Sequence, residues 1–162
     1  MKQPKKDNPP KSLLARYARA ARAAFPHTVP VLTGYVFLGT VFGVLLQSAG
    51  YGTLFALLMS TAVYAGSMQF VAVSLLSGPF LPVQAALLTL MVNARHLFYG
   101  LSMLERFAGL GRAKPYMVFS LTDETFSLLC AVTPPEGVDP KAFDLCLSAM
   151  NQGYWVAGSV LG

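Results

Sequence analysis

Charged residues are scarce in this sequence, and their scarcity excludes an ordinary soluble domain. Only 12% of the 162 residues are Asp, Glu, Lys or Arg, about half the share found in soluble globular proteins. None occurs between Arg22 and Arg95, while 54% of the whole chain is hydrophobic. A bilayer-spanning helix needs about 20 mostly apolar residues, so this uncharged stretch is long enough for two or three spans. The sequence therefore predicts an all-α, multi-span integral membrane protein.

Motifs for enzymatic and nucleotide chemistry are also missing. The sequence contains no H-E-x-x-H metal site, no G-x-S-x-G nucleophile motif and no phosphate-binding glycine loop. We therefore expect no catalytic residues, no metal, no cofactor and no built-in ATP motor. The two cysteines, Cys130 and Cys146, lie in or beside apolar segments. They are interpreted as small hydrophobic side chains rather than as a disulfide or a metal-binding pair.

Positive charge is concentrated near the N-terminus. Of the 12 Lys and Arg residues, seven precede the first long apolar run: Lys2, Lys5, Lys6, Lys11, Arg16, Arg19 and Arg22. A basic segment is also found in nucleic-acid-binding proteins, but this one adjoins hydrophobic spans, whose cytoplasmic flanks are rich in Lys and Arg. We therefore predict a cytoplasmic N-terminus and no nucleic-acid partner. Residues 1–25 are expected to form a basic tail in which 11–25 is a helix on the membrane surface, and 26–162 the transmembrane domain.

Apolar segments separated by Gly, Pro and polar residues predict five spans. They cover about residues 28–47, 53–76, 82–104, 116–132 and 142–162. The last segment is still apolar at Gly162, although spans usually finish with polar or aromatic anchors. We therefore expect the chain to be a fragment of a longer protein.

The positions of the charged loops conflict with five simple crossings. Three crossings after a cytoplasmic start would place the cationic loop 105–114 outside, against the positive-inside rule. A broken or re-entrant element within 53–82 removes the conflict, and glycine at 65–67 favours a break there. In that version the acidic loop 136–139 lies outside.

Two segments of the chain resemble each other. Residues 34–43 and 153–162 both read G-Y-x-x-x-G-[S/T]-V-x-G. Internal repeats are typical of secondary transporters, and this pattern predicts a partial repeat. The GxxxG pair inside each segment is also typical of a small-residue helix-packing face, so both interpretations stay open.

Polar side chains are densest inside the third expected span. Asn93, Arg95, His96 and Tyr99 lie within eight residues, and polar groups in hydrocarbon are costly enough to need a reason. On a helix Asn93 and His96 share one face, while Arg95 and Tyr99 share the adjacent face. Asn93 is predicted to contact substrate, whereas the other three are candidates for a polar relay or gate.

The fourth expected span supplies a partner for Arg95. Asp123 and Glu124 lie at a depth similar to that of Arg95 when both spans are counted from their connecting loop. We predict an ion pair between Arg95 and one of these carboxylates, which leaves the other protonated or hydrated. A carboxyl group kept neutral by desolvation is suited to a proton relay, and so Asp123 and Glu124 complete the predicted relay. A static clamp between helices is the alternative.

A second cluster of small and polar residues covers 65–70. An unwound turn there would present backbone amides, carbonyls and two polar side chains to a small zwitterion. Gly66, Ser67 and Gln69 are therefore predicted substrate-binding residues. Close helix packing through small residues is the alternative.

Several of these motifs occur together in one known family. The sequence resembles the AzlC family through Gly34-Tyr35 with Gly39 and Phe42-Gly43, Ala65-Gly66-Ser67-x-Gln69-Phe70, Val92-Asn93-x-Arg95-His96-x-x-Tyr99-Gly100 and Thr122-Asp123-Glu124. The resemblance implies the large subunit of a two-component branched-chain amino-acid exporter in the bacterial cytoplasmic membrane. It also implies a small membrane partner of the AzlD type. Family members usually continue through further spans beyond the point where this chain stops.

The sequence therefore favours a secondary transporter that exports branched-chain or other neutral amino acids and is driven by protons. The alternative from another class is a non-transporting membrane scaffold that stabilises a partner. A scaffold should pack densely around Gly66 and Arg95, whereas a transporter should leave a wet cavity there. A membrane enzyme is a distant third interpretation.

Overall fold

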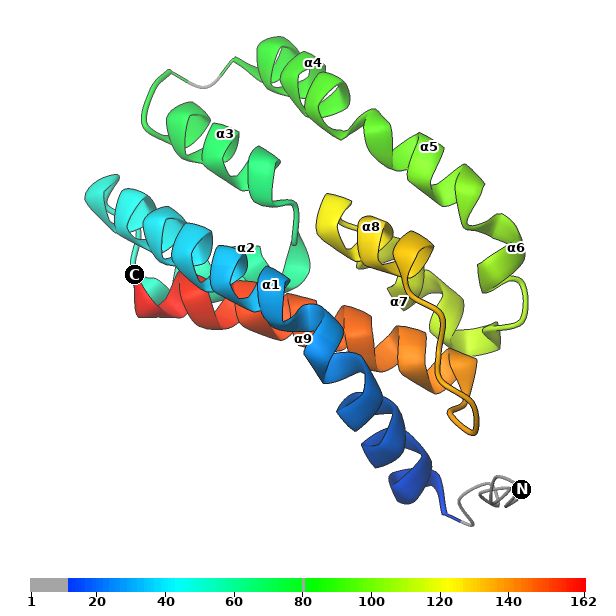
Figure 1. Cartoon of the computed structure of the whole chain (residues 1–162). Coiled ribbons are helices and arrows are strands. Elements are labelled where there is room, and N and C mark those ends of the chain that lie inside the picture. Colours follow the sequence, from blue (N-terminus) through cyan, green and yellow to red (C-terminus); the bar gives the residue numbers. More distant parts are fainter. Residues whose placement is uncertain (1–11, 80) are drawn as a thin grey trace, which may run out of the picture.

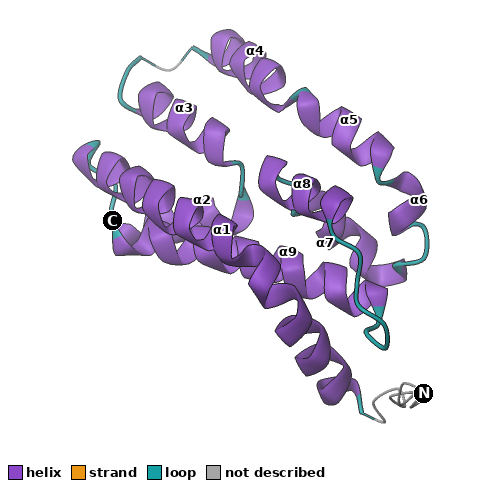
Figure 2. Cartoon of the chain, in the orientation of Figure 1, coloured by secondary structure: helices purple, strands orange, loops and turns teal. Residues whose placement is uncertain are grey.

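The regular structure of the described residues is entirely helical (Figure 2). The computed structural model describes residues 12–79 and 81–162, so residues 1–11 of the expected basic tail lie outside the described residues. The α-helices are α1 (Leu13–Ser48), α2 (Thr53–Ala62), α3 (Gly66–Leu76), α4 (Pro82–Asn93), α5 (Arg95–Ser102), α6 (Leu104–Phe107), α7 (Lys114–Phe119), α8 (Asp123–Ala131) and α9 (Pro140–Leu161). A 3-10 turn at Gly111–Ala113 precedes α7. The all-α prediction is confirmed.

Helix α1 is longer than its sequence predicts. Its 36 residues span about 54 Å at the rise of an α-helix. Among the described helices, only α1 is long and apolar enough by itself to cross a membrane. The expected end of a surface helix at Phe25 is wrong, because α1 continues through Pro26 and Pro30. Its buried face runs unbroken from Ala24 to Thr28, so packing outweighs the local cost of proline, about 3 kcal/mol.

Helices α1 and α9 cross with their backbones in contact. The two similar segments, 34–43 and 153–162, lie on these helices and face each other. A Cβ atom added at Gly39 would lie 2.9 Å from the amide nitrogen of Ser159, and one added at Gly158 would lie 2.8 Å from the Tyr35 carbonyl oxygen. Glycine is therefore required on both sides of the crossing. This contact agrees with the interpretation of the two GxxxG pairs as a helix-packing face. The partial internal repeat stays a prediction.

Helices α2 and α3 form a helical hairpin whose tip lies in the middle of the molecule (Figure 1). The hydroxyl of Tyr51, just before α2, donates to the carbonyl of Leu76 at the end of α3 (3.5 Å), so the hairpin begins and ends on the same side. The tip is formed by residues 63–65, where Tyr64 adopts a left-handed backbone with φ of +44°. The predicted break in this segment is confirmed, and it precedes Gly66 rather than including it.

Helices α7 and α8 form a second hairpin, which enters from the opposite end of the molecule (Figure 1). The sequence predicts a single span over 116–132, and this prediction is wrong because the chain breaks at 120–122 and turns back. The physical reason is that residues 122–124 favour the start of a new helix, which average hydropathy over the segment does not reveal. Thr122 caps α8 by accepting from the amide of Thr125 (3.3 Å), and acidic residues in the first turn favour the helix N-terminus.

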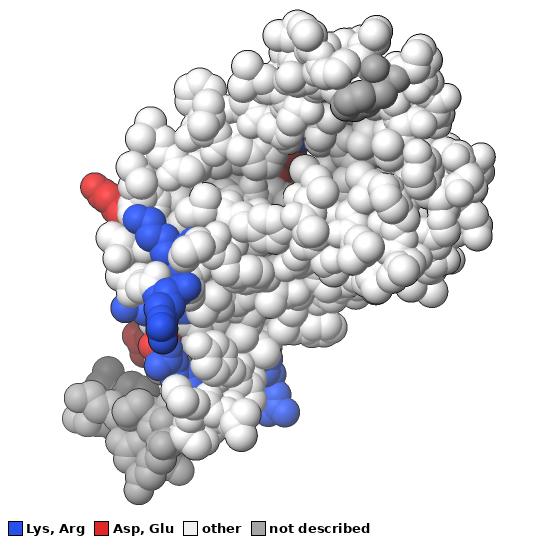
Figure 3. Space-filling view, turned by 180° about the vertical axis from the view of Figure 1, so that it is seen from behind, with Lys and Arg blue, Asp and Glu red and all other residues white. Residues whose placement is uncertain are grey.

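Basic side chains gather at one end of the molecule, here called the basic end (Figure 3). The loop between α8 and α9 lies at this end, because Arg16 pairs with Asp139 (3.3 Å) and Arg19 donates to the Gly137 carbonyl (3.4 Å). The expectation that the acidic loop 136–139 lies opposite the basic N-terminal segment is therefore wrong. Hydropathy counting missed the turn at 120–122, which returns the chain to the side from which it entered.

The glycine crossing yields a test of stability. We expect Gly39→Ala to lower stability by about 1–3 kcal/mol, the usual cost of overpacking, because the new methyl group would meet the α9 backbone. Gly34→Ala on the same helix is the matched control, since a Cβ there has nothing within 4 Å. Thermal unfolding in detergent measures both variants. Equal melting temperatures would contradict the close crossing.

Candidate functional site

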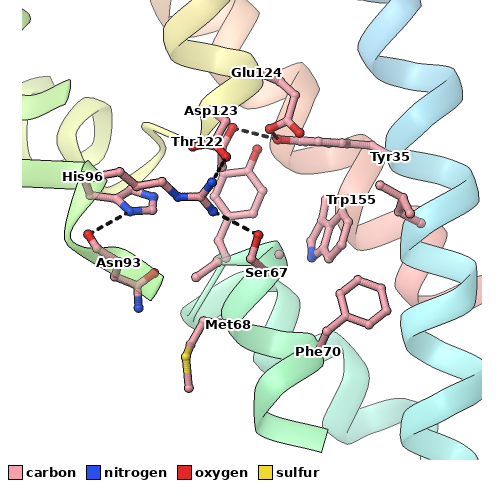
Figure 4. A pocket seen from close by; sticks show the side chains of 15 residues that line it. Tyr35, Ser67, Met68, Phe70, Asn93, His96, Thr122, Asp123, Glu124 and Trp155 are labelled. Atoms are coloured by element: carbon pink, nitrogen blue, oxygen red, sulfur yellow. Dashed lines mark hydrogen bonds and ion pairs between the residues drawn. The ribbon is translucent and has the colours of Figure 1, made fainter. Parts of the chain in front are cut away.

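A cavity of about 110 Å³ lies where the tips of the two hairpins meet (Figure 4). The junction of α4 and α5 at Ala94 reaches the same place, so three interruptions of helical structure converge there. One water needs about 10–15 Å³ of such space, so the cavity has room for several waters or a small solute. The lining residues are Tyr35, Leu38, Tyr64, Ala65, Gly66, Ser67, Met68, Phe70, Asn93, Arg95, His96, Thr122, Asp123, Glu124 and Trp155. Charged atoms are visible inside a hollow that is surrounded by uncharged surface, away from the basic end (Figure 3).

Arg95 joins three elements across the cavity. Its Nη1 forms an ion pair with Oδ2 of Asp123 at the start of α8, and its Nη2 donates to the hydroxyl of Ser67 on α3 (2.9 Å). Both charged side chains remain more than one third exposed. The Nε of Arg95 and Oδ1 of Asp123 have no hydrogen-bond partner within the described residues. The pair therefore contains two buried polar atoms that the described chain does not satisfy.

Glu124 is held by hydroxyl groups rather than by a cation. The hydroxyl of Tyr35 on α1 donates to its Oε2 (2.6 Å), and the same hydroxyl lies 2.7 Å from Oγ1 of Thr122. No Lys, Arg or His of the described chain forms a salt bridge with Glu124. The cavity therefore combines one compensated charge pair with one uncompensated carboxylate, a group that favours a cationic partner or a proton.

The N-terminus of α3 opens into the cavity. Ala65, at the N-cap position, provides no side-chain hydrogen bond, and the first backbone bond of the helix is donated by Gln69 to the Ala65 carbonyl (2.8 Å). The amides of Gly66, Ser67 and Met68 precede that bond and so have no partner inside the helix. Together with the helix dipole they favour a negatively charged group.

One wall of the cavity is apolar and is built on Trp155 of α9. Its indole packs edge to face against Tyr35, with ring centroids 5.4 Å apart. A Cβ at Gly66 would already lie 3.2 Å from the indole ring, so glycine keeps the hairpin tip close to this wall. The indole Nε1 donates to Oε1 of Gln69 (2.9 Å), whose Nε2 donates to Ser60 (3.2 Å). These two bonds fix the ring plane that faces the cavity.

The structure brings most of the predicted site residues together. Those that line the cavity are Gly66, Ser67, Asn93, Arg95, His96, Asp123 and Glu124. Gln69 lies behind Trp155 instead, and Tyr99 stacks on Phe126 with ring centroids 4.3 Å apart. Neither lines the cavity, so a substrate contact for Gln69 and a relay role for Tyr99 stay predictions.

Sequence reasoning missed several residues that shape the site. Tyr35 and Trp155 each occur in a G-Y-containing segment that the sequence singles out only as a packing motif or repeat. Tyr64 lines the cavity at the tip of the first hairpin, where its backbone is left-handed. No sequence pattern predicts this backbone conformation for a tyrosine. Asn151, which the sequence offers either as a supplement to the 65–70 site or as a cap of the last span, does not line the cavity, and its side-chain amide donates to the hydroxyl of Thr125 (3.0 Å).

The charge pair yields a test that does not depend on transport. We expect Arg95→Gln and Asp123→Asn each to lower the melting temperature in detergent, because each leaves one charge without its partner. The double variant should recover part of the loss. Additive effects of the two substitutions would show that the side chains do not interact.

Comparison with known proteins assigns the chain to a family. Residues 30–162 match the family described as AzlC protein. The branched-chain amino acid transport protein AzlC of Bacillus subtilis (strain 168) is 45% identical over 143 residues, which are 88% of this chain and 56% of that protein. An uncharacterized membrane protein of Helicobacter pylori (strain ATCC 700392 / 26695) is 44% identical over 146 residues, 90% of this chain and 64% of that protein.

A more distant relative is the inner membrane protein YgaZ of Escherichia coli (strain K12). It is 30% identical over 138 residues, 83% of this chain and 56% of YgaZ. This chain therefore spans between half and two thirds of these curated relatives. No solved structure matches it. The relatives named as membrane proteins agree with the predicted membrane class, and the match over residues 30–162 shows that this chain belongs to the AzlC family.

Proposed function

We propose that this chain forms the substrate-binding part of a secondary transporter for branched-chain and other small neutral amino acids. The observation that carries the proposal is the cavity between the two opposed hairpin tips. Discontinuous helices that meet at a central site are typical of secondary transporters. Irregular backbone at membrane depth is tolerated where it lines such a cavity. A scaffold would instead pack densely around Gly66 and Arg95, both of which line open space.

The groups around the cavity complement each part of an aliphatic amino acid. The free amides at the start of α3 and the guanidinium of Arg95 suit the substrate carboxylate. Glu124, which has no cation partner in the described chain, suits the ammonium group. The apolar side chain would then lie along Trp155 and Phe70. The name of the Bacillus subtilis relative, a branched-chain amino acid transport protein, supports this choice of substrate.

The distribution of charge supports an orientation in the bilayer. We place the basic end in the cytoplasm by the positive-inside rule, in the bacterial inner membrane. Helices α1 and α9 and the run α4–α6 then cross the bilayer, while the hairpins α2/α3 and α7/α8 enter from opposite sides. This arrangement brings both tips to the middle of the membrane and keeps every basic loop on one side.

The same site supports proton coupling as part of the proposal. Glu124 can be neutralised either by a proton or by the substrate ammonium, so the two would replace each other there. His96 also lines the cavity, and its Nδ1 lies 3.2 Å from the Asn93 carbonyl oxygen. We propose that it assists the transfer of the proton to and from Glu124. Export and a small AzlD-type partner subunit are what the family resemblance implies, and we include both in the proposal.

Valine efflux tests the transport function. Cells that express this protein with its small partner would be loaded with labelled valine, and Arg95→Gln compared with Arg112→Gln at matched membrane abundance. We expect Arg95→Gln to reduce efflux about tenfold to hundredfold, because hydrogen bonds to charged groups contribute about 1.5–3 kcal/mol. Arg112 is exposed outside the cavity, so its variant should behave as wild type. Equal efflux from the two variants would refute the site, and no efflux by wild type would favour the scaffold.

Cysteine labelling tests the orientation. In a background in which Cys130 and Cys146 are replaced by alanine, single cysteines would be introduced at Ala108, Gly137 and Gly78, which are all exposed. We expect positions 108 and 137 to react from the cytoplasmic side and position 78 from the outside, because the second hairpin returns to the basic end. Labelling of 108 and 137 from opposite sides would contradict the re-entrant α7/α8 hairpin.

A further inference from the structure

We propose that the ion pair between Arg95 and Asp123 is a latch that the carboxylate of the substrate opens. In the loaded site the substrate carboxylate takes the place of Asp123 on Arg95, and this exchange frees the layer formed by α4 and α5 from α8. The latch rests on the proposed amino-acid transport and deepens it, because it names the part of the substrate that transport requires beyond binding. An analogue with the ammonium group but no carboxylate would bind at Glu124 and leave the latch closed.

The α4–α5 layer is weakly attached to the other helices. It lies along one edge of the molecule (Figure 1), and none of the residues in α4 or α5 is buried. Within the described chain, the only hydrogen bonds and ion pair that leave residues 82–102 for another helix are those of Arg95 to Asp123 and Ser67. Tyr99 adds a stacking contact with Phe126 of α8. Elements with so little burial open at low cost, and Arg95 carries the polar attachment of this one.

The layer is anchored where α5 meets α6, towards the basic end. Met103 and Phe107 are 5% and 1% exposed and belong to the core that contains Phe143 and Leu147 of α9. Helical geometry is interrupted at Met103, whose ψ of 3° separates α5 from α6. Hinges in proteins are residues at the ends of elements that absorb such changes of backbone angle. Motion about Met103 would displace α4 and α5 and leave α6 in the core.

Asp123 and a substrate carboxylate compete for the same guanidinium. Arg95 is always charged, so it needs an anion in every state, and the incoming carboxylate has the charge and shape of the one that it replaces. Both side chains of the pair line the cavity and are more than one third exposed, at 38% and 37%. The substrate therefore reaches the pair from the cavity, and the charge of Arg95 stays compensated throughout the exchange.

Each carboxylate has a second source of support, which keeps the exchange from being costly. Asp123 is the first residue of α8, where the positive end of the helix dipole stabilises its charge when Arg95 is withdrawn. The substrate carboxylate meets the amides at the start of α3, beside the Ser67 hydroxyl that accepts from Arg95 (2.9 Å). Arg95 therefore stays connected to α3 through the substrate while it leaves α8. A neutral or cationic group offers Arg95 no replacement for Asp123.

The two conformations differ in what they offer a ligand. A ligand shifts a conformational equilibrium only by the difference between its affinities for the two states. With the latch closed, Asp123 occupies Nη1 of Arg95, and with the latch open this nitrogen is available to the substrate. A zwitterion therefore binds the open state more tightly, whereas an amine that contacts Glu124 alone binds both states equally. Binding and opening are thus separable by the choice of ligand.

Distances between pairs of spin labels test the latch in protein reconstituted in a lipid bilayer. In the background without native cysteines, labels would be attached to cysteines at Leu90 on α4 and Val118 on α7, which are 64% and 49% exposed. A control pair at Phe37 and Leu161, 69% and 72% exposed, lies on the two helices of the α1–α9 crossing. Each pair would be measured without ligand, with valine and with 2-methylpropylamine, which is valine without its carboxylate.

We expect valine to raise the population of a changed distance between Leu90 and Val118 about tenfold or more, with the control pair unchanged. The amine should displace labelled valine and leave both distances as they are without ligand. An amine that changes the first distance as valine does, or one that fails to displace valine, would overturn the latch. Bound valine that leaves the first distance unchanged would also overturn it.

Two substitutions open the latch without a ligand. Asp123→Asn and Arg95→Gln each remove one charge of the pair, and each should raise the population of the changed distance about tenfold or more in the absence of valine. Arg112→Gln, exposed and outside the cavity, is the control and should match wild type. Wild-type distances in both test variants would refute the latch alone. A wild type that neither binds nor transports valine would refute the proposed transport and the latch with it.

Discussion

The close crossing of α1 and α9 is the contact on which the remaining structure depends. In a bilayer, lipid tails are as apolar as leucine, so helices associate through close packing rather than through burial from water. Here Gly39 and Gly158 let the backbones touch, with no room for a Cβ on either side. The same crossing sets Tyr35 and Trp155 edge to face. One of these residues holds Glu124 and the other forms the apolar wall, so the helix crossing determines both the charged and the apolar sides of the cavity.

The helix interruptions and the cavity depend on one another. Backbone amides and carbonyls freed at a break need partners, and hydrocarbon offers none. The breaks at 63–65 and 120–122 therefore meet each other and the α4–α5 junction around a polar space, instead of facing lipid. The unpaired amides at the start of α3 are then available to a ligand. A cavity in this position follows from the need to solvate interrupted helices.

The interior charges are organised in two distinct ways. Arg95–Asp123 and Arg106–Asp144 are ion pairs that tie separate helices together, one at the cavity and one near the basic end. Glu124 has only hydroxyl support within the described chain, through Tyr35. Between the two ends, α9 turns its polar residues inward rather than towards lipid. By burying Asp144, Ser148 and Asn151, α9 reverses the pattern of a soluble amphipathic helix.

The sequence by itself determined the class of the protein, the break near Gly66 and the pairing of Arg95 with an acidic residue of the following segment. Composition decides whether a chain faces lipid, and depth can be counted from the nearest charged loop. Tertiary structure decided the rest. It continued α1 through two prolines, turned the chain back at 120–122, and brought the acidic loop to the basic end. It also placed Gln69 behind Trp155. These outcomes depend on contacts between residues far apart in the chain, whose energies outweigh the local preferences that a sequence pattern records.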